Sequence, residues 1–322
     1  MSESTPETRG ELEFVRRLRP ILAVPGGTSG STLADPLKGV PFGDDLATLV
    51  PGPEPLLWTV DMLMDGVDFD TRVHDGRAIG RKAMAVNLSD CAAMAVTPVA
   101  ALCAVALPNT LSMEAALDVL RGAHEYGLRF DCPIVGGDTN SWNAPLVISV
   151  SVAARCTPGL RPIRRDGARP GDRIWLTGRV GGSILGRHMT FDPRIATALE
   201  LSRCLAPHAM IDISDGVALD LSRILSASGC GAILDEFALD AAIHADAVRL
   251  AEQDHESPRA HALSDGEDFE LIVVLPADAA TDVCTRLGLL PVGRIVAESG
   301  LWLGAPTGGR EPIPVRGWEH FR

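Results

Sequence analysis

Apolar residues along the chain follow two spacings, one typical of helices and one typical of strands. Spacings of three and four residues predict helices over 10–20, 77–95 and 112–127, and a further helix that ends near Ser228. Alternating or continuous apolar runs predict strands over 56–63, 98–108, 146–155, 173–180, 209–214 and 269–276. Ser112 is a typical helix N-cap, and Gly127 and Gly229 stand where helices commonly end. Helices and strands mix in both halves, so the pattern fits an α/β and an α+β fold equally.

Two turn-rich segments interrupt these elements. Gly, Pro, Ser and Thr dominate 25–42, which predicts a loop that is either a plain linker or a lid over a site. The segment 156–172 is rich in Pro, Gly and Arg and is the candidate domain boundary. A length of 322 residues suggests about two domains, so we predict an N-terminal domain over 1–155 and a C-terminal domain over 156–322.

Composition and charge narrow the class of protein. A hydrophobic content of 46% and a charged content of 22% are typical of a globular protein with a large core. The net charge of −13 disfavours nucleic acid and anionic membranes as main partners. No apolar run reaches the roughly 18 residues of a membrane helix, and the N-terminus lacks a signal-peptide pattern. Seven scattered cysteines without C-x-x-C favour reduced thiols, so we expect a cytoplasmic protein.

Carboxylates recur beside glycine or serine at predicted turns. They are Asp44, Asp45, Asp61, Asp65, Asp68, Asp70, Asp90, Asp138, Asp212, Asp215, Asp265, Glu267 and Asp268. Any one of them has a structural explanation, because aspartate caps helices and fills turns. Several follow directly on apolar strands, as Asp61, Asp138 and Asp212 do, and could converge. Two carboxylates about 4 Å apart repel by roughly 4 kcal/mol at an effective dielectric near 20, so a converging set would need cations. Hard oxygen ligands without paired histidines indicate Mg²⁺ rather than zinc.

Phosphate handling requires hydrogen-bond donors as well. The chain lacks the G-x-x-x-x-G-K-[ST] pattern and the H-R-D and D-F-G pair of protein kinases. The glycine-rich stretch 177–186 either cradles phosphate with its N–H groups or forms a tight structural turn. Two glycines before Asp138 are similar, and Arg164 and Arg165 could meet a phosphate or be solvated. No serine or cysteine stands in a nucleophile motif, so the residues alone predict a metal-dependent phosphate-handling protein.

Eight motifs, taken in order, resemble those of the thiamine-monophosphate kinase family. They are GDDLATL, VDMLMDGVDF, KAMAVNLSDCAAMAVTP, GGDTN, RDGARPGDRIWLTGRVGGS, IDISDGVALDLSRIL, ALSDGEDFEL and GWEHF. The resemblance spans about residues 10–322 and places the chain in the superfamily of aminoimidazole ribonucleotide synthetase and selenophosphate synthetase. It implies a two-domain α/β subunit with the aminoimidazole ribonucleotide synthetase-like fold. Its N-terminal strands would form a barrel across a homodimer.

The resemblance also implies the chemistry: direct, Mg²⁺-dependent transfer of the ATP γ-phosphoryl group onto thiamine monophosphate, without a phosphoenzyme. It implies metal ligands at Asp44, Asp45, Asp61, Asp90, Asp138, Asp212 and Asp215, with catalytic roles for Asp45, Asp61, Asp138 and Asp212. It implies ATP contacts at Gly137, Asp138, Arg165 and Ser214, and thiamine monophosphate contacts at Asp68, Glu267 and Trp318. The N-terminal domain would then bind ATP and Mg²⁺ and dimerise, and the C-terminal domain would complete the site.

Four positions depart from the family's motifs, one of them Asn140, which stands where the family has threonine. Asp68 stands where the family usually has histidine, Val60 where it has threonine, and Asp265 where it has glycine. A carboxylate at position 68 removes a cationic contact to the acceptor phosphate and adds negative charge beside it. These changes concern the acceptor more than the ATP and metal site. Two alternatives therefore stay open: a related ATP-dependent enzyme with another acceptor, and a non-catalytic paralogue that binds nucleotide or thiamine phosphates.

Overall fold

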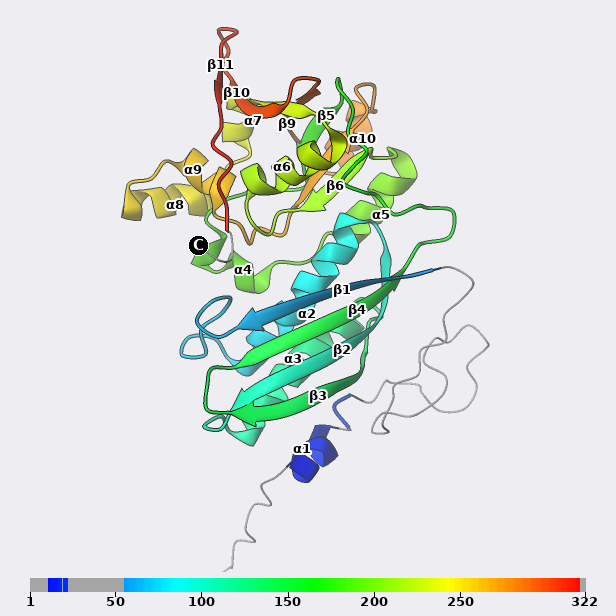
Figure 1. The fold of residues 1–322 in the computed structure, drawn as a ribbon, viewed down its shortest axis with the longest axis vertical. Helices are drawn as coiled ribbons and strands as arrows, with labels where there is room; N and C mark the ends of the chain where they lie inside the picture. Colours follow the sequence, from blue (N-terminus) through cyan, green and yellow to red (C-terminus); the bar gives the residue numbers. More distant parts are fainter. Residues whose placement is uncertain (1–10, 19, 23–54, 319–322) are drawn as a thin grey trace, which may run out of the picture. The chain divides into compact units, whose positions relative to one another are not determined.

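The computed structural model describes residues 11–18, 20–22 and 55–318 and divides into two compact units (Figure 1). Unit 1 comprises Met1–Asn87 and Pro98–Arg155, and unit 2 comprises Leu88–Thr97 and Cys156–Arg322. Within the described ranges, no helix combines the length and the apolar character that crossing a membrane requires.

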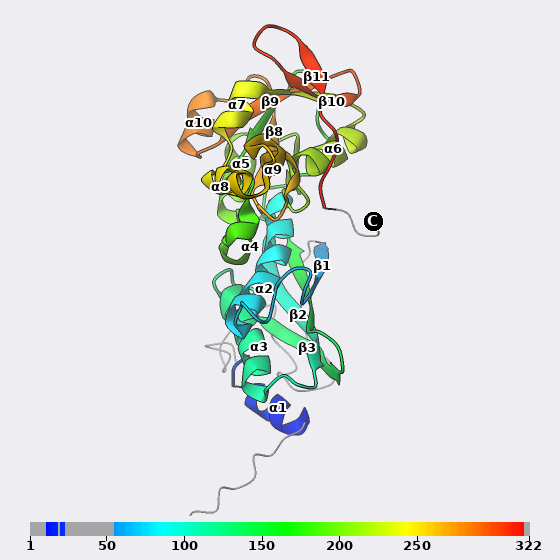
Figure 2. The same cartoon turned by 90° about the vertical axis from the view of Figure 1, so that its left-hand side faces the viewer.

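Unit 1 is built on a four-stranded sheet. Its elements are α1 (Glu11–Leu18), β1 (Leu56–Met64), α2 (Gly76–Ala93), β2 (Thr97–Pro108), α3 (Met113–Leu128), β3 (Ile134–Trp142) and β4 (Val147–Arg155). The strand order is β1-β4-β2-β3, with β1 and β4 antiparallel and β2 and β3 parallel. Figure 2 shows α2 and α3 on the same side of this sheet. The end of α2, from Leu88 onward, belongs to unit 2.

The two faces of the four-stranded sheet differ sharply in burial. On the face that α2 and α3 cover, Ile148 and Val150 of β4 are buried, as is Cys103 of β2. The other face, which we name the open face, carries Trp58, Val60, Met62, Met64 and Leu102 as exposed side chains. Because side chains alternate along a strand, the inward positions of β1 are the half-buried Thr59 and Asp61.

Unit 2 is built on a seven-stranded mixed sheet of order β11-β10-β7-β9-β5-β8-β6. The strands are β5 (Arg173–Leu176), β6 (Ala209–Asp212), β7 (Gly231–Asp235), β8 (Leu271–Leu275), β9 (Leu290–Val296), β10 (Gly300–Gly304) and β11 (Arg310–Pro312). The helices are α4 (Arg187–Thr190), α5 (Ile195–Cys204), α6 (Val217–Ser228), α7 (Glu236–Ala241), α8 (Ala245–Asp254), α9 (Pro258–Ser264) and α10 (Thr281–Arg286), with a 3-10 turn η1 (Ser183–Leu185). Leu221 and Ile224 of α6 share one buried cluster with Ile272 and Val274 of β8. This packing fixes the chain between β6 and α6 at the edge of the sheet.

The predicted helices and strands all correspond to elements of the structure, with shifted ends. Ser112 caps α3 by accepting a hydrogen bond from Ala115 N, and Gly229 ends α6 in the left-handed region. Gly127, however, does not end α3. It stays helical and buried. Glycine is needed there because a Cβ would lie 2.3 Å from the carbonyl oxygen of Cys132. The strand predicted over 173–180 ends at Leu176, where the glycine-rich stretch begins. The continuation of β3 beyond Gly137 and most short elements of unit 2 were not predicted.

Candidate active site

In unit 1, Asp61 and Asp138 lie within strands rather than after them. Asp61 is inside β1 on its inward side, and Asp138 is inside β3, paired with the exposed Ala104 of β2. The two carboxylates therefore stand on opposite faces of the sheet. They are also three strand spacings apart, on the order of 14 Å. Within one copy of unit 1 these two residues do not converge, which corrects the expectation that they follow strands and meet at one edge.

Gly137 is required by a close approach of two strands. A Cβ at this position would lie 1.8 Å from the carbonyl oxygen of Cys103 in β2. Glycine is therefore the residue that allows β2 and β3 to pair here, immediately before Asp138. Gly137 and Asp138 are both exposed, so the strand presents its backbone and a carboxylate together.

The carboxylate of Asp68 is hydrogen-bonded within the turn that follows β1. Its Oδ2 accepts a hydrogen bond of 2.7 Å from Met64 N. Its backbone carbonyl accepts a hydrogen bond from Lys82 Nζ, and Lys82 is fully buried in α2. The ammonium group of Lys82 thus holds the turn that carries Asp68, the position at which the family usually has histidine.

In unit 2, Asp212 is buried and is the last residue of β6, which ends two residues earlier than predicted. The hydroxyl of Ser89 donates to its Oδ2 over 2.7 Å. Ser89 and Asp90 are adjacent residues in the part of α2 that belongs to unit 2. The structure therefore brings the NLSD and DISDG motifs together, with Asp90 next to the residue that binds Asp212.

Asp215 is held by a partly buried ion-pair network with residues of α6. Asp220 accepts hydrogen bonds from Asp215 N and Gly216 N, at 2.9 and 3.1 Å, and is fully buried. Arg223 pairs with both Asp215 and Asp220. Burial raises the pKa of Asp220 to about 6, although the backbone N–H groups and Arg223 lower it. This network fixes the turn that carries Ser214 and Asp215.

Backbone hydrogen bonds join three distant segments at this turn. Glu267 N donates to Ser214 O over 2.8 Å, and Trp318 N donates to Asp215 O over 3.0 Å. We name the segments 212–215, 266–269 and 317–318 together the unit 2 junction. Four of the residues implied by the resemblance, Ser214, Asp215, Glu267 and Trp318, thus meet in one place. Trp318 is 53% exposed, so its ring is accessible there.

Arg165 lies beside the strand that leads to the junction. Arg164 O accepts a hydrogen bond from Met210 N of β6, and Arg165 O accepts one from Ser228 of α6. The side chain of Arg165 is exposed. Its backbone is therefore fixed against β6, two residues before Asp212.

Two N–H groups of the glycine-rich turn are bonded to aspartates of the protein. Gly181 N donates to both oxygens of Asp268, at 3.0 and 2.9 Å, and Gly182 N donates to Asp265 at 2.9 Å. These two N–H groups are therefore already bonded within the protein. These bonds favour the structural interpretation of the turn over the phosphate-binding one.

Several predicted features lie outside the described residues or remain apart within them. Asp44, Asp45 and the 25–42 loop fall in the segment that the structure does not describe. Across residues 11–18, 20–22 and 55–318, no group of three or more His, Cys, Asp or Glu side chains is arranged as a metal site. The donors present near Asp212 are hard oxygens, which suits Mg²⁺.

Comparison with known proteins identifies the family. A family model described as "AIR synthase related protein, N-terminal domain" matches residues 43–156. A thiamine-monophosphate kinase from Rhodopirellula baltica is 40% identical over 302 residues, which cover 90% of this chain and 94% of the relative. The chain belongs to the thiamine-monophosphate kinase family. The resemblance found in the sequence motifs is thereby confirmed.

Solved structures of the thiamine-monophosphate kinase family share the fold. AaThiL complexed with AMPPCP and TMP has a TM-score of 0.74 at 26% identity, covering 88% of this chain and 93% of that one. The thiamine-monophosphate kinase from Stenotrophomonas maltophilia K279a has a TM-score of 0.74 at 29% identity, covering 91% and 96%. The predicted aminoimidazole ribonucleotide synthetase-like α/β fold is confirmed.

Three residues that contact the residues implied by the family resemblance were not singled out from the sequence. Ser89 stands beside Asp90 in the NLSD motif, so the motif itself was a signal. Lys82 is one of only two lysines among 29 basic residues, and that rarity was a second signal. Arg223 has no comparable signal, because a basic residue on a helix is usually solvated.

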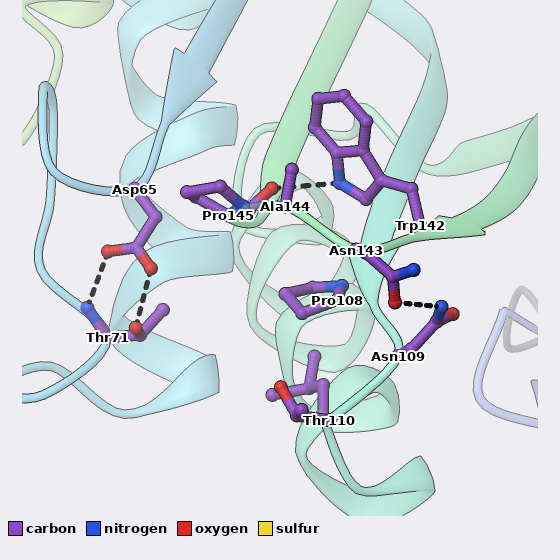
Figure 3. A pocket seen from close by; sticks show the side chains of 10 residues that line it. Asp65, Thr71, Pro108, Asn109, Thr110, Trp142, Asn143, Ala144 and Pro145 are labelled. Atoms are coloured by element: carbon purple, nitrogen blue, oxygen red, sulfur yellow. Dashed lines mark hydrogen bonds between the residues drawn. The ribbon is translucent and has the colours of Figure 1, made fainter.

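A pocket lies in unit 1 beside the turn after β1. It has a volume of about 430 Å³ and is lined by the turn after β1, the end of β2 and the β3–β4 turn (Figure 3). The carboxylate of Asp65 accepts hydrogen bonds from the N–H group and the hydroxyl of Thr71, and Asn109 donates a hydrogen bond to Asn143. Because these polar side chains bind one another, the pocket adds no residue to the implied active site.

Proposed function

We propose that this chain phosphorylates thiamine monophosphate to thiamine diphosphate, with ATP as the donor. The observation that carries the proposal is the unit 2 junction, where Ser214, Asp215, Glu267 and Trp318 meet through backbone hydrogen bonds. By the family resemblance these four positions serve nucleotide, metal and thiamine. AaThiL, which is similar to this chain over most of its length, is complexed with AMPPCP and TMP.

The proposed reaction is a direct in-line transfer. An oxygen of the acceptor phosphate bonds to the γ-phosphorus of ATP, the bond from that phosphorus to the β–γ bridging oxygen breaks, and ADP leaves with the electron pair. Both reactants are anions, so the protein acts mainly by positioning them and offsetting their charge. The bonds that Asp220 makes to the N–H groups of Asp215 and Gly216 preset the turn for this purpose.

The carboxylates suit Mg²⁺, which would offset phosphate charge when bound. We propose Asp90, Asp212 and Asp215 as ligands in unit 2, and Asp44 and Asp45 in the segment outside the described residues. Asp61 and Asp138 are proposed ligands in unit 1, and within one copy they would bind separate ions because they lie on opposite faces of the sheet. The buried Asp212, oriented by a hydroxyl group, supports this assignment. ATP would contact Gly137, Asp138, Arg165 and Ser214.

For the acceptor we propose contacts to Asp68, Glu267 and Trp318. The exposed ring of Trp318 offers a face on which a thiazolium cation can stack. Asp68, where the family has histidine, favours a second candidate: a kinase of this family with a different acceptor. Lys82, fully buried in α2, donates to the backbone carbonyl of Asp68 and so holds the turn that carries this residue, which supports the first candidate.

We also propose a homodimer in which the N-terminal strands of two copies form a barrel. The open face supports this, since Trp58, Val60 and Met62 are 60%, 62% and 62% exposed along one strand. Contiguous apolar surface of this kind is typical of an interface. Met62→Glu should convert the dimer to a monomer in analytical ultracentrifugation, whereas Val315→Glu, an exposed apolar position of unit 2, should not. A dimer that survives Met62→Glu would contradict this arrangement.

A cytoplasmic location fits the thiol chemistry. All seven cysteines are described, and each is free rather than paired in a disulfide. Proteins of oxidising compartments commonly cross-link such residues.

The acceptor is tested by comparing substrates. ADP release with ATP and Mg²⁺ is measured with thiamine, thiamine monophosphate or an unrelated phosphomonoester, and products are separated by chromatography. We expect thiamine monophosphate alone to stimulate release and to yield thiamine diphosphate. Asp212→Asn should abolish turnover, and Asp282→Asn, an exposed carboxylate of α10, should not. Stimulation by the other phosphomonoester alone would favour the second candidate.

A further inference from the structure

Two aspartates hold neighbouring N–H groups of the glycine-rich turn. Asp268 accepts from Gly181 N with both carboxylate oxygens, and Asp265 accepts from Gly182 N at 2.9 Å. A Cβ at Gly181 would lie 2.7 Å from the backbone of Ala262, so the turn is pressed against α9. Both aspartates are thereby bonded to the same turn of unit 2, which packs against α9.

The chain between these aspartates adopts an uncommon backbone. Gly266, Glu267 and Phe269 have φ values of +76°, +51° and +51°. Side-chain-bearing residues rarely adopt this region, so surrounding contacts must hold the segment there. The hydroxyl of Ser183 donates to Gly266 O over 2.8 Å, and the ring of Phe269 stacks on Phe191 at 4.0 Å between centroids.

Both aspartates are anchored a second time from outside the turn. Arg187 Nη2 lies 3.0 Å from Asp268, and its Nε lies 3.0 Å from Asp246 of α8. His261 Nδ1 lies 2.9 Å from Asp265. Glu267 thus stands between two carboxylates that are each bound by a backbone N–H group and a basic side chain.

We propose that Asp265 and Asp268 are positioning residues that fix Glu267 at the acceptor site. The inference rests on the proposed function, because it takes Glu267 as a thiamine monophosphate contact. It also gives Asp265 a role that the family's glycine does not have. Its carboxylate binds Gly182 N and His261 within the protein, and so fixes the loop instead of opposing the acceptor.

The test measures KM for thiamine monophosphate and for ATP, with kcat and the melting temperature. Asp265→Ala removes both bonds, whereas Asp265→Asn keeps an oxygen that can accept from Gly182 N. Asp254→Asn is the matched control, because Asp254 contacts the opposite nitrogen of the same His261 and does not reach the turn. Asp265→Ser, whose hydroxyl is shorter, replaces the alanine variant if that variant does not fold.

We expect Asp265→Ala to raise KM for thiamine monophosphate about tenfold, the loss typical of one charge-assisted hydrogen bond. KM for ATP should stay within about twofold, and Asp265→Asn and Asp254→Asn should resemble wild type. An unchanged KM for thiamine monophosphate, or an equal rise in both KM values, overturns the positioning role while leaving the proposed function intact. Absence of thiamine diphosphate with the wild-type protein overturns both.

Discussion

Ser89→Ala tests how Asp212 is held for metal binding. Ser89 Oγ donates to Asp212 Oδ2 over 2.7 Å, and the two residues are 1% and 4% exposed. The substitution removes this donor without adding bulk or altering the carboxylate. Because the site is buried, water cannot readily take the place of the hydroxyl. We therefore expect Asp212 to lose orientation and Mg²⁺ to bind more weakly.

The size of the effect follows from this bond. A hydrogen bond to a charged group contributes about 1.5–3 kcal/mol, and a short one to a carboxylate belongs to this class. Since about 1.4 kcal/mol corresponds to a factor of ten, the Mg²⁺ concentration for half-maximal rate should rise about 10- to 100-fold. The maximal rate at saturating Mg²⁺ should recover in large part.

The assay is ADP release at fixed ATP and thiamine monophosphate while Mg²⁺ is varied. Ser222→Ala is the matched control, because its hydroxyl donates to Leu219 O inside α6 and does not contact Asp212. It should leave the Mg²⁺ dependence unchanged. A wild-type Mg²⁺ curve for Ser89→Ala, even with reduced stability, would refute the reasoning, since the bond would then be structural only.

Three further predictions concern pH, packing and the acceptor turn. Burial raises the pKa of Asp268 from 3.8 to about 7, so the folded state keeps a proton that the unfolded chain releases first. The free energy of unfolding should therefore fall as pH rises from about 4 to about 7, and urea denaturation should show a smaller fall for Asp268→Asn. Gly137→Ala places a Cβ 1.8 Å from a carbonyl oxygen of β2 and should lower the free energy of unfolding by about 1–3 kcal/mol, whereas Gly309→Ala meets open space and should not. Lys82→Met removes the ammonium that donates to Asp68 O and should raise KM for thiamine monophosphate about tenfold in steady-state kinetics; equal changes in both substrates' KM values would contradict this.

The region around Asp212 shows how far the sequence predicts such a site. The apolar run before Asp212, the amphipathic spacing after Gly216 and the glycine at position 229 are local signals, and β6 and α6 form accordingly. The hydrogen bonds to Glu267 and Trp318 depend on β8 pairing with β6 and on where the C-terminal segment lies. Local spacing carries no information about which distant strands become neighbours.

Two limits of prediction have physical causes. The GGDTN segment contains residues that are uncommon in strands, yet pairing with β2 makes it part of β3. Tertiary pairing therefore overrides local propensity at Asp138. The glycine-rich turn offers N–H donors that suit phosphate and carboxylate alike. The glycine pattern cannot distinguish these anions, and the structure fills the donors with Asp265 and Asp268.

The central claim is that ATP phosphorylates thiamine monophosphate at a site that depends on Asp212. The most direct measurement follows the label from ATP radiolabelled at the γ-phosphate, with thiamine monophosphate and Mg²⁺, in wild type and Asp212→Asn. The account predicts labelled thiamine diphosphate with wild type, none with the variant, and no label retained on the protein. Label appearing only as inorganic phosphate, or equal product from both proteins, would contradict it.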